Sequence, residues 1–564
     1  MARRTLLLVI LALIGISTLV HCRQTPRTQT VADLVVQGGS IYTMNPDSPT
    51  AESVVIGGER ILFVGKRSRA ASYIGPETRV VELGDRAAYP GFNDAHAHLV
   101  GLGASLRRLD LMGTPSFESI VEMVAAAARE SEPGQWILGR GWDQNDWPEK
   151  AFPTHQALSA VSPENPVVLE RVDGHAVMAN RRAMDIAGID TQTPDPDGGK
   201  IHRDARGRAT GVLIDTASGL VESHVPESTR EEIRKETLLA IEECYRYGLV
   251  GIHDAGVDKR TLEVYRELID DGRFDFRLYA MVSATSPYLQ EALRRGPEIG
   301  TGNHRLTVRA VKMYVDGALG SRGAALLEPY SDDPTNRGLL VTDRTTLETI
   351  VNDCLGAGFQ VCTHAIGDRG NRLMLDTYQT AFDRSPYPDP RFRIEHAQVL
   401  ALEDIPRFRT LGIIPSMQPT HCTSDMDWAP DRLGDSRTVG AYAWRSLLDD
   451  GNPIPCGSDF PVERVNPLLG VYAAVTRQHP DGTPDGGWFP DQRMTREEVV
   501  RGFTADAAYA AFEEDLRGTL EVGKFADLSI FDRDILECPD PEILEARAWM
   551  TIVAGNVVYG PDAR

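Results

Sequence analysis

Two histidines, His96 and His98, stand two positions apart near the end of the apolar run AAYPGFNDAHAHL (87–99). In a β-strand this spacing points both imidazoles to the same side, so both can bind one metal ion. The pair alone is weak support, because so short a motif also arises by chance in a chain with 13 histidines. Other residues must therefore decide whether it is a metal site.

Three further apolar runs also end on metal-binding residue types. The segment THAIGD places His364 at the tip of one run, IEHAQ places His396 at the tip of the next, and GSDFPV places Asp459 at the tip of the last. Imidazole nitrogens and carboxylate oxygens suit a divalent ion such as zinc. If these runs are neighbouring parallel strands, four imidazoles and one carboxylate meet on a single rim.

Lys312 lies inside the apolar run VRAVKMYV (308–315), on the same strand face as Ala310 and Tyr314. A lone ammonium group is strongly disfavoured in such a place and tends to lose its proton. One interpretation is an ion pair with Asp316 or Asp459. The other is a neutral amine that reacts with carbon dioxide, giving a carbamate anion that bridges two metal ions.

Apolar strands alternate with helical stretches through the middle of the chain, a pattern that predicts parallel βα units. Eight candidate strands are present: 87–99, 249–256, 276–285, 308–317, 359–368, 391–398, 412–420 and 452–462. Eight such units predict an α/β protein with a TIM-like (β/α)8 barrel, which places its active site at the carboxyl ends of the strands.

The rest of the chain predicts two additions to this barrel. The stretch at about 100–248 is far too long for a barrel loop and contains its own helices and strands, which predicts an inserted subdomain after the first strand that forms a lid or a pocket wall. Short strands separated by glycines and polar turns occupy residues 32–86 and 515–560. We expect them to pair into one small β-sandwich built from both termini, leaving 87–514 for the barrel and its insertion.

The first residues resemble a signal peptide (1–22) followed by a polar tether (23–31). A basic start precedes an apolar run over 5–20, which is shorter than the roughly 20 residues of a membrane-spanning helix. Cys22 is placed like the lipidated cysteine of a bacterial lipoprotein, but His21 replaces the small residue usual before it, so a conventionally cleaved signal and an uncleaved anchor are alternatives. We expect an exported bacterial protein, periplasmic or lipid-anchored, that meets the membrane only through this segment.

The composition argues against nucleic acid as a partner. The 564 residues carry a net charge of -22, which repels the phosphates of nucleic acids. The seven cysteines form no Cys-x-x-Cys pair, which argues against a disulfide framework and against a cysteine zinc site. The sequence leaves a homo-oligomer open.

Taken together, these motifs resemble the amidohydrolase superfamily, in particular the two-metal members with a carboxylated lysine bridge. More narrowly, the chain is similar to the branch that contains N-substituted formamide deformylases and YtcJ-like hydrolases. The segments that carry this narrower resemblance are GRGWDQNDW (139–147), DGHAVMAN (173–180), DGALGSRGAALLEPY (316–330), HAIGDRGN (364–371) and GSDFPVE (457–463).

The resemblance implies a small-molecule substrate, a reaction and a set of metal ligands. His96, His98 and Asp459 would hold one metal, His364 and His396 the second, and carboxylated Lys312 would bridge them. Two zinc ions are expected, with manganese or iron as alternatives. Asp459 would carry a proton from water to the departing nitrogen, which implies hydrolysis of carbon–nitrogen bonds in amides such as N-acyl or N-formyl amines.

Four more residues are candidates for substrate binding, each with a structural alternative. They are His175, Trp142, Asp143 and Arg322. The alternatives are a structural role for His175, a packing role for Trp142 and a salt bridge for Arg322. We interpret His253 as a packing or hydrogen-bonding residue, and His421 as a loop residue beyond the seventh strand. Alternative functions are a deaminase or cyclic-amide hydrolase, a phosphotriester or lactone hydrolase, or a metal-binding lipoprotein without catalysis.

Overall fold

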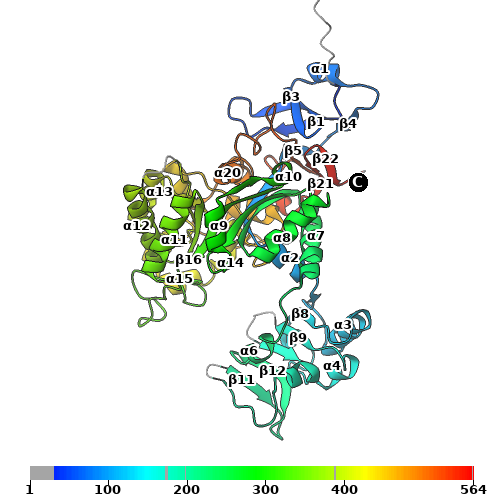
Figure 1. Ribbon diagram of the computed structural model, residues 1–564, viewed down its shortest axis with the longest axis vertical. Coiled ribbons are helices and arrows are strands. Elements are labelled where there is room, and N and C mark those ends of the chain that lie inside the picture. Colours follow the sequence, from blue (N-terminus) through cyan, green and yellow to red (C-terminus); the bar gives the residue numbers. More distant parts are fainter. Residues whose placement is uncertain (1–30, 172–175, 197–198, 386–388, 562, 564) are drawn as a thin grey trace, which may run out of the picture.

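The computed structural model of the protein describes residues 31–561 and 563, except 172–175, 197–198 and 386–388. The predicted signal peptide and nearly all of the predicted tether lie outside the described residues, as does His175. Figure 1 shows a barrel in the middle of the molecule, a sheet from the chain termini on one side of it, and the long insertion on the other. No helix in the described part of the chain is long and apolar enough to cross a membrane.

Seven regular strands run parallel and pair in sequence order around the barrel, which confirms the predicted fold class. They are buried on both faces, as expected of strands covered by helices outside and by packed side chains inside. A short strand, β15 (Glu298–Gly300), adds to β16 in the antiparallel sense. The seven parallel strands are β6 (Phe92–Ala97), β13 (Leu249–Val257), β14 (Arg277–Ser283), β16 (Leu306–Tyr314), β17 (Gln360–Ala365), β18 (Arg393–His396) and β19 (Ile414–Ser416).

The eighth predicted strand, 452–462, is not a regular strand. It makes a single parallel bridge between Met417 and Cys456, and the Ala95 amide donates to the Cys456 carbonyl oxygen at 2.9 Å. Pro453 and Pro455 explain the difference, because proline has no backbone N–H to donate to a ladder. The segment still fills the gap between β19 and β6, so the barrel is nearly closed.

Helices follow most of the barrel strands and pack with them around one apolar core. Side-chain caps fix several helix starts: Asp258 accepts from the Thr261 amide, and Asp343 accepts from the Thr346 amide. The helices from the exit of the insertion onward are α7 (Arg230–Arg246), α8 (Lys259–Asp270), α9 (Leu289–Arg295), α10 (Thr301–His304), α11 (Arg344–Ala357), α12 (Asp368–Arg384), α13 (Ile405–Leu411), α14 (Pro419–Asp425), α15 (Ala429–Leu433), α16 (Asp435–Thr438), α17 (Trp444–Asp449), α18 (Pro467–Thr476), α19 (Arg496–Gly502), α20 (Ala505–Ala510) and α21 (Asp540–Glu545).

Strands from both ends of the chain share one sheet in the order β22-β21-β20-β5-β1-β2-β3, with β4 also paired to β1. The predicted first barrel strand, 87–99, therefore divides at Gly91 into β5 of this sheet and β6 of the barrel. The Ile61 amide donates to the Lys524 carbonyl oxygen at 3.0 Å, so the sheet bends back over its own apolar core. Its strands are β1 (Leu34–Tyr42), β2 (Thr50–Gly57), β3 (Arg60–Gly65), β4 (Arg79–Glu82), β5 (Ala87–Pro90), β20 (Leu528–Phe531), β21 (Ala548–Val553) and β22 (Asn556–Tyr559), with the short helix α1 (Arg67–Ala70) after β3.

The insertion forms a separate six-stranded sheet in the order β11-β12-β10-β9-β8-β7, with two apolar clusters of its own. The chain enters the insertion through α2 (Leu99–Leu106) and leaves it through α7. These two helices lie side by side, and Arg107 forms an ion pair of 2.6 Å with Glu236. Its other elements are β7 (Leu109–Asp110), α3 (Phe117–Glu130), β8 (Ile137–Trp142), α4 (Gln156–Val161), β9 (Val167–Arg171), β10 (Ala176–Ala179), α5 (Arg181–Ile186), β11 (Gly199–Arg203), β12 (Ala209–Asp215) and α6 (Gly219–Glu222).

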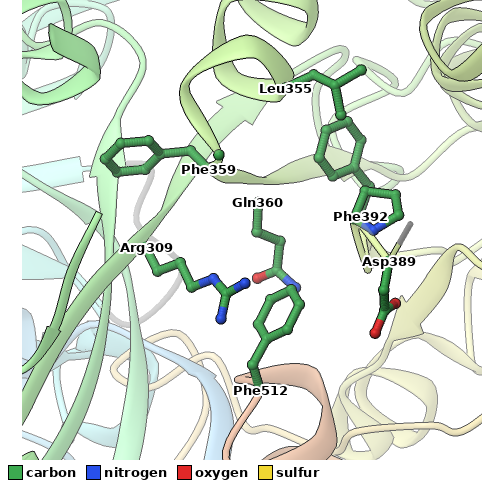
Figure 2. A pocket seen from close by; sticks show the side chains of 9 residues that line it. Arg309, Leu355, Phe359, Gln360, Asp389, Phe392 and Phe512 are labelled. Atoms are coloured by element: carbon green, nitrogen blue, oxygen red, sulfur yellow. The ribbon is translucent and has the colours of Figure 1, made fainter. Parts of the chain in front are cut away.

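Phe359, Phe392 and Phe512 are among the residues that line a small pocket where β17 begins (Figure 2). This cavity of about 10 Å³ lies beside Gln360, the first residue of β17. The Arg309 guanidinium lies 3.5 Å from the ring centroid of Phe512, and both side chains line this cavity. A cavity of this size holds at most about one water molecule, so it is not a substrate site.

Candidate metal centre

All six predicted ligands meet at the carboxyl end of the barrel. The parallel register pairs Tyr314 with His364 and Ala365 with His396, so the last residues of β16, β17 and β18 lie side by side. Ring contacts link the cluster: the centroid of His396 lies 4.6 Å from that of His364 and 4.9 Å from that of His96. The convergence that the strand ends predict is therefore present.

One group that can hold a divalent ion consists of His96, His98 and Asp459. The Asp459 Oδ1 atom lies 3.0 Å from His98 Nε2 and 3.6 Å from His96 Nε2. Their donor atoms all lie within 4.8 Å of one another. Donors bound to one zinc ion at about 2.1 Å lie at most about 4.2 Å apart, so a small contraction would suffice.

A second group consists of His396, His421 and Asp459. It differs from the predicted pairing of His364 with His396. His421, in α14, places its Nε2 atom 3.8 Å from Asp459 Oδ2. His364 belongs to neither group; its Nε2 atom lies 3.9 Å from Asp316 Oδ1.

Hydrogen bonds fix which nitrogen two of the histidines present to the centre. The Nδ1 atom of His96 lies 2.5 Å from a Glu395 oxygen, and the Nδ1 atom of His396 lies 2.7 Å from the Gln418 amide oxygen. Arg393 holds Glu395 in an ion pair of 2.7 Å, and both side chains are fully buried. These contacts turn both Nε2 atoms toward the centre, as outer partners of metal-binding histidines usually do.

Lys312 is 1 % exposed, and its Nζ atom lies 3.0 Å from His96 Nε2. Burial lowers the pKa of Lys312, although Glu395 and Asp459 act in the opposite direction. A lowered pKa enlarges the fraction of neutral amine, the form that reacts with carbon dioxide.

The buried imidazoles are kept neutral. Burial lowers the pKa of His96 to about 4 and that of His364 to about 3, and it lowers the pKa of His396 well below its usual value. For Asp459, burial would raise the pKa, but the His98 hydrogen bond and the surrounding imidazoles lower it well below its usual range. Neutral imidazoles beside an ionised carboxylate are the protonation states that a metal requires.

Two residues of the centre have left-handed backbone conformations that residues other than glycine seldom adopt. His396 has a φ of 73° and Asp459 a φ of 62°. Such conformations cost free energy and cluster at functional sites, where the surrounding fold holds them in place. In this barrel they occur where β18 and the eighth segment end, at the residues that face the centre.

A pocket of about 280 Å³ opens beside His98 and is lined in part by Asp254, Gly256 and Tyr265. An adjoining pocket of about 530 Å³ shares Gly256 with it and extends over the ends of β13 and β14. Tyr314, 37 % exposed, lies with its ring centroid 5.3 Å from that of His364. The carboxyl end thus offers room for a small molecule next to His98.

The predicted substrate residues of the insertion and of the loop after β16 have partners of their own. Trp142 is buried in the core of the insertion, and its indole N–H donates to the Leu169 carbonyl oxygen at 2.7 Å. Asp143 forms an ion pair of 2.6 Å with Arg171. Arg322 donates to both carboxylate oxygens of Asp332, at 3.1 and 2.8 Å. The substrate roles of these residues, and that of His175, stay predictions.

Sequence reasoning missed Glu395 and Gln418, and it interpreted His421 as a loop residue. A signal for Glu395 was present: Arg393 and Glu395 stand two apart in a predicted strand and have opposite charges, as in a buried ion pair. The only signal for His421 was its place directly after the seventh strand, in the segment Gln418 to His421.

Comparison with known proteins identifies the family. A sequence profile described as “Amidohydrolase family” matches residues 79–559, most of the chain. The chain belongs to the amidohydrolase family. YtcJ of Bacillus subtilis is 32% identical over 531 residues, which are 93% of this chain and 98% of its own. N-substituted formamide deformylase of Arthrobacter pascens is 27% identical over 538 residues, 93% of this chain and 98% of its own.

A solved structure agrees with this amidohydrolase assignment. The crystal structure of an uncharacterised metal-dependent hydrolase from Pyrococcus furiosus has a TM-score of 0.75 and 29% identity to this chain, with coverage of 89% of this chain and 100% of its own. The protein is therefore a metal-dependent hydrolase of small molecules. The histidine and aspartate groups at the barrel's carboxyl end fit the divalent metal that the family implies.

Proposed function

We propose that this amidohydrolase cleaves the carbon–nitrogen bond of small amides, N-acyl or N-formyl amines, with two divalent metal ions. The observation that carries the proposal is Asp459, whose carboxylate lies between two histidine groups at the carboxyl end of the barrel. The relative named N-substituted formamide deformylase supports an amide as the substrate class.

The residues present suit such a centre. His96, His98 and Asp459 would hold one ion, His364 and His396 would bind the second, and carboxylated Lys312 would bridge the two. Bound divalent ions, which we expect to be zinc with manganese or iron as alternatives, supply Lewis-acid polarisation of the substrate carbonyl and make water more acidic. The burial of Lys312 beside His96 supports the bridging role, because burial lowers the pKa of its ammonium group and so enlarges the fraction of neutral amine.

Asp459 moves the proton in this mechanism. Its Oδ1 atom lies 3.0 Å from His98 Nε2 and its Oδ2 atom lies 3.8 Å from His421 Nε2. Each carboxylate oxygen has two lone pairs, so the carboxylate can hold metal and still accept a proton from water. It can then pass that proton to the amide nitrogen, because an amine leaves readily only when it is protonated. Glu395 and Gln418 keep the imidazoles oriented throughout.

A substrate panel tests the proposal. The purified protein, supplied with zinc or manganese, is assayed on N-formyl and N-acyl amines, cyclic amides, amino-substituted heterocycles, lactones and phosphotriesters. Release of a primary amine from the acyclic amides, with the highest kcat/KM in the panel, is the expected result. Release of ammonia from amino-substituted heterocycles without amide cleavage would show a deaminase instead.

A further inference from the structure

We propose that His421 is a metal ligand, and that Asp459 joins two metal subsites through its two oxygens. The inference rests on the metal centre of the proposed function and adds a donor to it. It assigns the second ion a group of donors from three places in the barrel: His396 at the end of β18, His421 on α14, and Asp459 in the eighth segment.

The two oxygens of Asp459 face different histidines. Oδ1 lies 3.0 Å from His98 Nε2 and 3.6 Å from His96 Nε2, whereas Oδ2 lies 3.8 Å from His421 Nε2. Each oxygen therefore completes one of the two groups whose donor atoms lie within 4.8 Å of one another. A carboxylate that bridges two ions in this way would set them side by side.

The Nε2 atom of His421 is buried and has no hydrogen-bond partner among the described residues. A buried polar atom without a partner costs about 1–3 kcal/mol, and native proteins seldom leave one unexplained. The ring of His421 is nearly parallel to that of His396, at 19° and 5.8 Å between centroids. A metal ion held between these rings and Asp459 would satisfy the free nitrogen.

The chain around His421 is held firmly. Gln418, three residues earlier, orients His396, so one short segment positions two donors of the group. At the end of α14, Asp425 accepts hydrogen bonds from Gln398, at 2.7 Å, and from Tyr442. His421 thus lies on an anchored helix, where a ligand can be positioned accurately.

The test is a metal titration of the full chain after removal of metal by a chelator. Zinc or cobalt is added in competition with a chromophoric chelator, and both the number of ions and their affinities are measured. We expect two ions for the unaltered protein. His421→Ala should keep one ion and weaken the other by at least about 10- to 100-fold, the loss typical even for an outer partner.

His479→Ala is the matched control, since His479 pairs with Asp427 at the surface and should titrate like the unaltered protein. Circular dichroism and melting curves check folding, and His421→Gln replaces His421→Ala should the latter not fold. The visible spectrum of bound cobalt gives a second readout, because the loss of an imidazole ligand changes it. Two ions with unchanged affinities and spectrum in the variant would overturn the inference. No bound ion in the unaltered protein would instead refute the proposed function.

Discussion

Asp459 has two roles in the proposed chemistry, metal binding and proton transfer. It lies against His98 and His421 through different oxygens, and its lowered pKa keeps it ionised at neutral pH. Its left-handed backbone shows that the fold tolerates strain to aim this side chain. Position and charge together suit a group that both binds metal and moves a proton.

Replacing Asp459 by asparagine separates these two roles. The amide keeps an oxygen for metal but cannot accept a proton, so we expect kcat to fall by about 10²- to 10⁴-fold, the usual contribution of a general base. Bound metal, measured by elemental analysis of the same preparation, should decrease much less, because the histidines of both groups remain. Turnover equal to that of the unaltered enzyme would show that the proton passes through another group.

The buried histidines predict how the metal-free protein responds to acid. The pKa of His96, about 4, and that of His364, about 3, lie below the ordinary value of 6.5, so the unfolded chain binds protons first as the pH falls. Stability is then complete above about pH 6.5 and is lost as the pH falls towards these folded-state values. Between about pH 7 and pH 5 each histidine should remove about 2 kcal/mol from the free energy of unfolding.

Urea titrations of chelator-treated protein at the two pH values measure this loss. The variant His96→Gln should show a smaller difference between them, while His479→Ala should behave like the unaltered chain. Burial raises the pKa of Asp94 and of Asp316 to about 7, so these carboxyl groups add stability as the pH falls over the same range and the comparison between variants is decisive. The same pH dependence in His96→Gln as in the unaltered chain would contradict the neutral state of His96.

Four histidines, Lys312 and Asp459 could be proposed as ligands from the sequence. A strand fixes which side a residue faces, and polar groups seldom stand in apolar runs. His421 could not be predicted in the same way. It lies on a helix, and it approaches Asp459, which is 38 positions away in the sequence, only because the fold brings the two residues together. Pairwise contacts of this kind leave no periodic trace in the sequence.

At the scale of elements, the eighth segment shows where pattern reasoning loses accuracy. Its apolar run predicts a strand, yet two prolines reduce it to a single bridge with Met417. The segment still approaches β6 closely: a Cβ added at Gly457 would lie 2.6 Å from both Asp94 Oδ1 and the His96 backbone nitrogen. Close backbone approach, rather than a regular ladder, positions Asp459 beside the histidines.

Gly457→Ala tests this close approach. The added methyl group should push the eighth segment away from β6 and cost about 1–3 kcal/mol of stability, as overpacking usually does, and it should weaken metal binding as well. Gly356→Ala in α11 is the control, because a Cβ there meets nothing within 4 Å and should leave stability unchanged or slightly higher. Equal melting temperatures and metal affinities for the two variants would contradict the account of this segment.

At the scale of the whole molecule, the barrel carries all six predicted ligands and His421, while the insertion has apolar clusters of its own. The length of the stretch after the first barrel strand predicted the insertion. The short strands at both ends of the chain predicted that the two ends share one sheet. The substrate pocket could not be predicted, because its shape depends on loops that carry no repeating pattern.

Deleting the insertion tests whether the barrel folds and binds metal without it. Because α2 and α7 pack together and Arg107 pairs with Glu236, residues 109–227 can be replaced by a short glycine–serine linker. We expect cooperative unfolding and unchanged metal content, with altered kcat/KM on the amide panel. An insoluble or metal-free product would show that the insertion supports the barrel.

Metal content per chain tests the central claim most directly. Elemental analysis of full-length protein purified without chelators should find about two divalent ions per chain, one for each group around Asp459. About one ion per chain would contradict the two-metal centre and favour a single-metal enzyme. No bound ion, with no gain of activity when zinc or manganese is added, would contradict the proposed chemistry altogether.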